Sequence, residues 1–573
     1  MIRRTIKNGT HRRQNSGTSV FWWLCTGWCL VWSWVVYLPE QLLAKEDSLQ
    51  SQPRTRETLR LAVDDDPHSL DPTQLWSNHA AALSFLIFNS LIEEHPGAGF
   101  VPALAAALPT ISPDARTFRF RLRPGIRFSN GRELVAEDVV YSFERGCDPS
   151  LGWSVAPFFR NILGSPEFGA ARAQDAEQSV SPEFSKRQRR SPQSVAGLRA
   201  LDRYTFQLQL LHPDLTAMMF MASIGIVPRE EVLRTDRPFG TFPIGTGAFR
   251  LKHWSRGTEM EFERNPTGFS TGPVRLDAVE VMLNVDQTTQ AMMIDRGEIN
   301  FQFYCGDTDV RRWRADPLFR TNLVTFKGAA PNFVALNCEL PPYTNRLVRR
   351  ALNHAVNKEV IVRKLLNRGV PAYGPLPANA KGYNPKVRGY AYDPEKARAL
   401  LREAGFPNGF TTTLWVLQVD PTQVKLGLSI QEDLRAVGVT AEIRLVSWPT
   451  LLESMSRRRT VPMGLMNAPA STEPKDFLDF LLNGENIAEE GSLNMAFYSN
   501  MAVQTLLREA ATAAEETARI HLYQQIEQRI IEDAPWIFLC HADMDMVRQP
   551  WLRGARCAPL WPPVRFECAW IER

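Results

Sequence analysis

Apolar and charged residues alternate along residues 116–123, and the spacing changes further along. Phe118, Phe120 and Leu122 are separated by arginines, a period of two that predicts a strand with one buried face and one wet face. A Pro-Gly pair breaks this pattern. Asn130-Gly131 follows as a strong tight-turn signal, because both residues tolerate a positive φ angle.

The spacing becomes helical after this turn. Glu137 and Asp138 stand where the first turn of a helix favours negative charge, and Val139 and Phe143 then contribute to an apolar face. Residues 116–145 are therefore expected to form a strand, a tight turn and an amphipathic helix.

The same two periods recur along the rest of the chain. The expected strands are 58–63, 201–211, 332–337 and 441–446, and 274–300 is expected to form a strand and then a helix. Further helices are expected at 80–93, 348–361 and 428–439, and another is capped by Asp393, opened by Pro394 and closed by Gly405. Residues 163–193 mix small, polar and basic residues and are expected to be the least ordered part of the body.

Length and charge bound the class of protein. A chain of 573 residues is too long for one core, so two or three domains are expected. Its 44% hydrophobic and 22% charged residues are ordinary for a globular protein. Residues 1–44 hold five Lys and Arg and one acid, which accounts for the whole formal net charge of +4. The neutral remainder argues against nucleic acid as a partner.

The basic excess belongs to a targeting segment at 1–44. A basic start is followed by an apolar run at 20–37 and by Pro39, the pattern of an export signal. The run is also just long enough for an uncleaved membrane anchor, and two arginine pairs raise a twin-arginine route. Either alternative places the body outside the cytoplasm, in the periplasm or another extracytoplasmic space, after a polar linker at 45–56.

Motifs of catalysis and metal binding are missing from the sequence. It holds no G-x-S-x-G, no H-E-x-x-H, no P-loop and no C-x-x-C, so we expect no enzyme, no cofactor and no metal site. The acidic run 64–66 is interpreted as a solvated loop rather than as a metal site. The six cysteines beyond the leader are expected to be mostly buried free thiols.

Several stretches resemble one family of binding proteins. Residues 116–145 resemble the signature of the extracellular solute-binding proteins, family 5, which serve ABC importers of oligopeptides, dipeptides and nickel. Leu70-Asp71-Pro72, 242–249, 392–405 and 532–539 match further family phrases in the same order, over about residues 58–548. One departure is Val135, which stands where the family has a Thr that would cap the following helix.

The resemblance implies a fold and a mechanism. The fold is the periplasmic binding protein-like II class, two hinged α/β lobes with an extra domain inserted in the first lobe. Lobe I would comprise 57–94, 223–303 and 541–573, the extra domain 95–222, and lobe II 304–540. A monomer would close on a small-molecule or peptide ligand and present its lobes to an ABC permease in the membrane.

Ligand identity is where this chain departs from the family. The stretch that holds the peptide amine in relatives is 467–474 here, with Ala470 at the place of the family Asp, and no Arg follows Leu414-Trp415 to hold the peptide carboxylate. We therefore expect no free dipeptide held by the usual terminal charges, although Glu473 or Asp476 can substitute for the missing Asp.

Six residues are the candidate ligand contacts, and several classes of function stay open. The candidates are His68, Ser69, Asn332, Trp415, Asn467 and Ser471. Trp415 is interpreted either as a stacking wall or as a core residue. The ligand can be a longer or blocked peptide, an oligosaccharide, a metal chelate or another organic solute. The other functional classes are a receptor for a membrane signalling partner and, without any supporting motif, a hydrolase.

Overall fold

The computed structural model describes residues 56–75, 77–95, 99–148, 151, 157–178, 194–418, 421–456, 459–468, 471–487, 493–559 and 562–572. The described residues all belong to one compact unit, Arg56–Arg573. The predicted export signal at 1–44 and nearly all of the predicted linker lie outside the described residues. Within the described ranges, no helix combines the length and the apolar character needed to cross a membrane.

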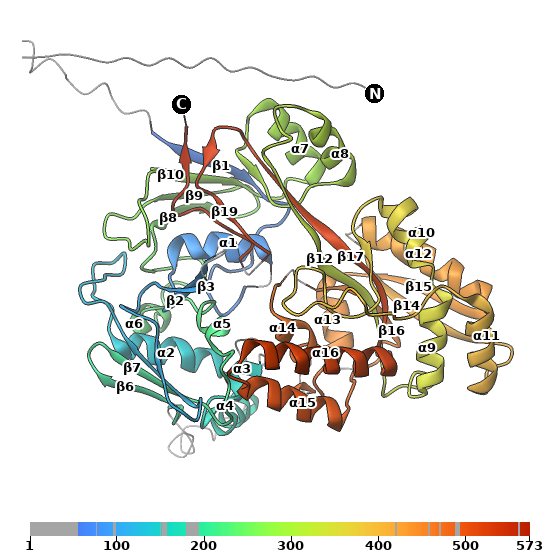
Figure 1. Ribbon diagram of the computed structural model, residues 1–573. Helices are drawn as coiled ribbons and strands as arrows, with labels where there is room; N and C mark the ends of the chain where they lie inside the picture. Colours follow the sequence, from blue (N-terminus) through green and yellow to red (C-terminus); the bar gives the residue numbers. More distant parts are fainter. Residues whose placement is uncertain are drawn as a thin grey trace, which may run out of the picture. The chain divides into compact units, whose positions relative to one another are not determined.

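One sheet of eleven strands organises the unit Arg56–Arg573 (Figure 1). Its strands are β1 (Thr58–Ala62), β8 (Phe249–Ser255), β9 (Glu259–Arg264), β10 (Ala278–Met282), β11 (Phe301–Gln302), β12 (Leu323–Leu336), β13 (Val370–Pro371), β14 (Phe410–Leu417), β15 (Val439–Val446), β16 (Met463–Asn467) and β17 (Trp536–Arg548). They follow the order β15-β14-β16-β12-β17-β11-β1-β10-β9-β8, and β13 pairs with β17. Parallel pairs occur toward both ends, between β1 and β10 and between β14 and β15.

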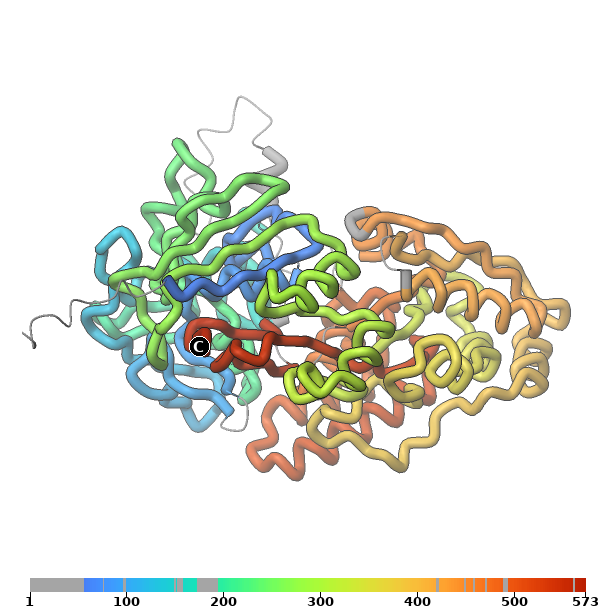
Figure 2. The backbone as a smooth tube through the Cα atoms, turned by 90° about the horizontal axis from the view of Figure 1, so that it is seen from above, coloured from blue at the N-terminus to red at the C-terminus, as the bar shows by residue number. Residues whose placement is uncertain are grey.

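The strands β12 and β17 form a long antiparallel ribbon in the middle of this sheet. Leu323 pairs with Val547 near one end, and Ala335 pairs with Trp536 near the other. The register shifts after Phe326, and Gly328 in this irregular stretch has a φ angle of +55°. Figure 2 shows β17, in red, passing from one group of elements into the other.

Separate hydrophobic cores lie at the two ends of the ribbon. Phe326 and Met544 pack into one core, whereas Phe333 and Phe538 pack into another. None of the core clusters among the described residues contains ribbon residues from both ends. We call the elements around the first end the first lobe and those around the other end the second lobe.

Helices cover the sheet in both lobes. The first lobe has α1 (Asn78–Ile87), α6 (Arg229–Val232), α7 (Gln287–Arg296) and α8 (Asp307–Ala315), with the short strands β18 (Leu552–Arg553), β19 (Arg556–Cys557), β20 (Val564–Arg565) and β21 (Trp570–Ile571). The second lobe has α9 (Arg346–Ala355), α10 (Lys358–Val360), the π-helical turn η4 (Ile361–Leu366), α11 (Pro394–Glu403), α12 (Pro421–Ala436), α13 (Trp448–Ser456), α14 (Pro474–Leu478), the 3₁₀ turn η5 (Gly484–Asn486), α15 (Met501–Thr512) and α16 (Glu516–Asp533).

An additional set of elements packs around its own core beside the first lobe. Its elements are β2 (Ile92–His95), β3 (Gly99–Pro102), β4 (Thr110–Ile111), β5 (Thr117–Arg121), α2 (Ala136–Gly146), α3 (Pro157–Arg160), α4 (Ser165–Gln178), β6 (Leu198–Asp202), β7 (Thr205–Gln209) and α5 (Met218–Met221). The strands β4-β5-β7-β6 form a second sheet, and the apolar side chains of β5, such as Phe118 and Phe120, are buried. We call this set the extra domain, while the residue boundaries given above for the three parts stay a prediction.

The stretch 116–145 folds as its pattern predicts, into β5, a turn and α2. Val135 precedes α2 and provides no side-chain cap. Asp138 compensates, since its carboxylate accepts a hydrogen bond from the Val135 amide at 2.9 Å and binds Arg132 in bidentate fashion at 3.0 and 2.6 Å.

Two expectations about local structure are wrong. The helix expected at 80–93 ends at Ile87, because Phe88 is extended and residues 92–95 form β2, which pairs with β3. In the stretch 163–193, residues Ser165–Gln178 form α4, in keeping with the high helix propensity of its four alanines. Residues 179–193 lie outside the described residues. The six cysteines beyond the leader are free thiols, as expected, but only Cys147, Cys305 and Cys540 are buried, so burial holds for half of them rather than for most.

Candidate functional site

Three candidate residues lie on neighbouring strands of the second lobe. Asn332 on β12 stands directly opposite Asn467 on β16, and Trp415 on β14 stands opposite Gly464 of the same strand β16. Asn332 is half-buried and donates a hydrogen bond to the Ala330 carbonyl at 3.3 Å, whereas Asn467 is exposed. The sheet therefore brings Asn467 next to Asn332, which is itself on the ribbon strand β12.

Trp415 is held inside the second lobe. Only 8% of the residue is exposed, and it packs in one core with Phe333 and Met466. Its indole N–H donates to the Thr413 hydroxyl at 3.2 Å, and the Arg444 guanidinium lies 4.9 Å from the ring centre. This burial favours the core interpretation of Trp415 over the stacking wall.

Ser471 organises the turn between β16 and α14. Its hydroxyl donates to the Asp476 carboxylate at 2.5 Å and accepts from the Glu473 amide at 3.0 Å. Glu473 itself forms an ion pair with Lys381. Two carboxylates of the second lobe thus have different partners, since one meets an ammonium and the other a hydroxyl.

Negative charge gathers around this turn on three half-buried carboxylates, those of Asp476, Glu473 and Glu94. Burial raises the pKa of Asp476 to about 7, and the nearby Glu473 carboxylate adds to the effect of burial. Burial and the same Glu473 raise the pKa of Glu94, which comes from β2 on the other side. Carboxylates of the extra domain and of the second lobe therefore lie near one another here. A positively charged group between them would relieve their repulsion.

The extra domain and the second lobe meet at α14. The Lys475 ammonium lies 2.5 Å from the Asp214 carboxylate and 2.8 Å from the Thr216 hydroxyl, both of which belong to the loop after β7. The Leu215 amide donates to the Ala511 carbonyl at 3.0 Å. These contacts join residues more than 250 positions apart and connect the extra domain to the second lobe.

His68 and Ser69 lie in the first lobe, in the loop after β1. His68 is exposed, and its carbonyl accepts a hydrogen bond from Arg256 at 3.1 Å. Ser69 is buried, and its hydroxyl accepts from the Asp71 amide at 3.1 Å. These two hydrogen bonds hold the loop after β1 in place. The role of His68 and Ser69 as ligand contacts stays a prediction.

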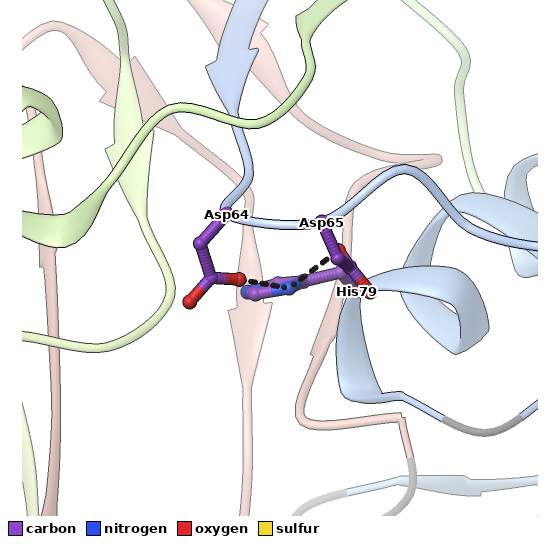
Figure 3. A group of neighbouring side chains, drawn as sticks. All are labelled: Asp64, Asp65 and His79. Atoms are coloured by element: carbon purple, nitrogen blue, oxygen red, sulfur yellow. Dashed lines mark hydrogen bonds and ion pairs between the residues drawn. The ribbon is translucent and has the colours of Figure 1, made fainter. Parts of the chain in front are cut away.

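A histidine that the sequence did not single out lies against the acidic run. The Nδ1 atom of His79 lies 3.2 Å from Asp64 and 3.2 Å from Asp65 (Figure 3). Burial by itself lowers the pKa of His79, but the two carboxylates outweigh it and raise the pKa to about 9. The three ligand atoms are close enough to hold a metal ion. A protonated His79 imidazole can balance the two carboxylates in the way that a metal ion would. The expected absence of a metal therefore stays a prediction.

We expect this triad to make stability depend on pH. The folded pKa of His79 lies above its unfolded value of 6.5, so its contribution is complete below pH 6.5 and lost as the pH rises through 9. A shift of this size corresponds to at most about 3 kcal/mol. Urea unfolding from pH 6 to pH 9.5 should show the wild type losing stability relative to His79→Gln. The exposed His253, changed to Gln, serves as the control and should parallel the wild type; equal profiles for His79→Gln and wild type would contradict the expectation.

Two cavities lie away from all six candidate residues. One of about 490 Å³ is lined by Arg123, Ile126 and Phe269, among others. The second, of about 550 Å³, is lined by His95, Arg275 and Trp570, among others. Both are formed by residues of the first lobe and the extra domain, so neither is part of the region where the lobes meet.

Comparison with known proteins settles the family. The sequence pattern of the bacterial extracellular solute-binding proteins, family 5 Middle, matches residues 99–489. The chain belongs to this family. The family and the fold class expected from the sequence are thereby confirmed, and so is the general function of a solute-binding component of an ABC importer. Members of this family are extracellular binding proteins rather than enzymes.

Individual relatives of this solute-binding protein carry different ligand names. Heme-binding protein A of Haemophilus influenzae is 28% identical over 485 residues, 80% of this chain and 82% of the relative. The dipeptide-binding protein of Escherichia coli is 26% identical over 508 residues, 85% and 89% of the two chains. The periplasmic binding protein DppA of Helicobacter pylori, solved with the peptide STSA, has a TM-score of 0.73 at 24% identity and covers 90% of this chain and 99% of its own.

Proposed function

We propose that this solute-binding protein captures a small-molecule or peptide ligand between its lobes, without converting it chemically, and hands it as a monomer to a membrane permease. The observation that carries the proposal is that the two lobes have separate hydrophobic cores. Two lobes with separate cores share one two-stranded ribbon and touch again at α14. Rotation about the irregular part of the ribbon, near Gly328, would open and close the region between them.

Asp476 is the group that we assign to a positive charge of the ligand. Glu473 already has Lys381 as its ion-pair partner, whereas the direct partner of the Asp476 carboxylate is the neutral Ser471 hydroxyl. The neighbouring Lys475 places its ammonium on Asp214. Burial is the main cause of the raised pKa of Asp476, and the neighbouring Glu473 carboxylate adds to it. Asn332 and Asn467 stand opposite each other on β12 and β16. Together with Ser471 they would contribute a polar wall, and Glu94 would approach from the other side.

Native mass spectrometry of the exported protein, purified without refolding, tests the proposed function. A co-purifying mass that leaves on mild denaturation identifies the solute and supports the proposal. When the preparation is free of solute, thermal-shift screens with peptides, sugars and metal chelates follow. If none of these stabilises the fold, a receptor for a signalling partner becomes the better account.

We expect Asp476→Asn to weaken binding of a cationic solute at least tenfold, because the ligand charge loses its half-buried counter-charge. Wild-type affinity should also fall as the pH drops from 8 to 5.5, since protonation neutralises Asp476. Isothermal titration calorimetry measures both effects. Asp236→Asn, at an exposed position, should bind as the wild type does. Micromolar binding of a free dipeptide that Glu473→Lys abolishes would contradict the assignment.

A further inference from the structure

The contact at α14 is built as a buried ion pair between two separately folded parts. The side chains of Lys475 and Asp214 are only 9% and 6% exposed. Lys475 comes from the second lobe, and Asp214 comes from the extra domain, whose core is its own. A buried ion pair is strongly affected when one partner is removed, because the remaining charge stays desolvated.

The surroundings of this pair are apolar. The Lys475 ammonium lies 5.5 Å from the centre of the Phe220 ring, and Phe220 in turn lies 6.5 Å from Phe480 across the same contact. One ring comes from α5 of the extra domain and the other follows α14. The Phe220 ring beside the ammonium lowers the polarity around the ion pair, which strengthens the attraction between the two charges.

Each charge also has a second partner on its own side of the contact. The Thr216 hydroxyl and amide donate to the Asp214 carboxylate at 2.6 and 2.9 Å. Lys475 lies 4.0 Å from Asp479, one turn further along its own segment. When the lobes separate, Asp214 keeps Thr216 and Lys475 keeps Asp479. The open form is therefore not penalised by bare charges, as a reversible contact requires.

A second interlobe ion cluster is placed differently. Arg368 of the second lobe binds Asp545 at 3.0 Å and Asp307 at 2.5 Å, and Asp545 belongs to the ribbon strand β17 itself. Rotation about the ribbon moves such neighbouring groups little. Lys475 and Asp214 are not on the ribbon, and the extra domain contributes no strand to it. Their contact therefore has to form or break when the lobes rotate.

We propose that Lys475, Asp214 and Thr216 form a latch that holds the two lobes closed and sets how much of the ligand-free protein occupies the closed form. The idea rests on the proposed function, because closure matters only for a protein that encloses its ligand. A ligand that needs the closed form has an apparent affinity scaled by the closed fraction. The latch then tunes affinity without touching the ligand.

Hydrogen exchange of the ligand-free protein tests the latch. The Leu215 amide donates across the contact to Ala511, so its exchange reports on opening. Lys475→Met should speed Leu215 exchange at least tenfold, while the amides between β12 and β16 stay protected. Arg508→Met serves as the matched control: its pair with Glu485 is exposed and lies entirely within the second lobe, and Leu215 exchange should stay at the wild-type rate.

Two outcomes would overturn the latch. Leu215 exchange within twofold of wild type in Lys475→Met means that the ion pair does not hold the contact. Equal loss of protection at Leu215 and in the β12–β16 pairing means that Lys475 supports the fold rather than closure. Since no ligand is present, failure to find a co-purifying solute would count against the proposed function alone and leave this result standing.

Discussion

Changing Asp71 to Ala is expected to lower the free energy of unfolding by about 3–5 kcal/mol, because it leaves a buried guanidinium without its counter-ion. Asp71 and Arg145 are 4% and 7% exposed. Their bidentate pair has N–O distances of 2.9 and 2.5 Å, and Thr73 donates to the same carboxylate at 2.9 Å through its hydroxyl. Urea unfolding of the purified protein measures the loss.

An exposed bidentate pair provides the control for this prediction. Arg234 and Asp236 are matched in chemistry but are 42% and 61% exposed, so Asp236→Ala should leave the unfolding midpoint unchanged. The double change Asp71→Leu with Arg145→Met removes both charges and should recover part of the loss. A midpoint for Asp71→Ala equal to that of Asp236→Ala would show that the buried pair contributes nothing.

The Asp71–Arg145 pair also explains why two separate sequence motifs occur together. Asp71 belongs to the Leu-Asp-Pro phrase after β1, and Arg145 ends the stretch 116–145. The pattern of each stretch predicts only its local structure, because periodicity reports which face is buried and not what lies across it. The pairing fixes the extra domain to the first lobe, and only the tertiary structure reveals it.

Local signals were most reliable where they were redundant. The helix α11 begins at Pro394 after the Asp393 cap, whose carboxylate accepts from the Lys396 amide at 2.9 Å, and Gly405 follows with a φ angle of +91°. The end of α1 has no such capping or helix-breaking residue. Residues 88–93 mix apolar and polar side chains and contain no Gly or Pro that would end the helix. The switch to β2 is decided by pairing of Ile92 with Pro102, a partner that a single window cannot contain.

In the candidate site, too, residues within one stretch can be predicted from the sequence, whereas contacts between distant stretches cannot. Ser471 and Glu473 can be named from the sequence because they lie in the stretch 467–474 that aligns with the family's amine-binding stretch, and their role as ligand contacts stays a prediction. Lys475 and Asp214 could not, since their meaning depends on contact across 261 positions. His79 carried one weak signal, a polar residue within an apolar helical run, and its partners Asp64 and Asp65 were interpreted as solvated.

Lys358 provides the last prediction, in which a substitution stabilises the protein. Its side chain is buried, and its ammonium has no hydrogen-bond partner among the described residues. The ammonium lies 5.8 and 5.9 Å from the ring centres of Tyr373 and Phe538. Burial lowers the pKa of Lys358 from 10.5 to about 7. Such a shift corresponds to at most about 5 kcal/mol against folding at low pH.

The sign of the pH dependence follows from proton binding. Between pH 7 and pH 10.5 the unfolded chain keeps the Lys358 proton that the folded protein has released, so wild-type stability rises with pH in this window. Lys358→Met removes the titrating group at similar volume. The variant should therefore be several kcal/mol more stable near pH 6, and the difference should shrink toward pH 10.5. Lys386→Met, at an exposed position, is the control and should match the wild type throughout. A gain for Lys358→Met that stays constant with pH would assign the effect to packing, and a loss would mean that the ammonium is stabilised by its aromatic surroundings.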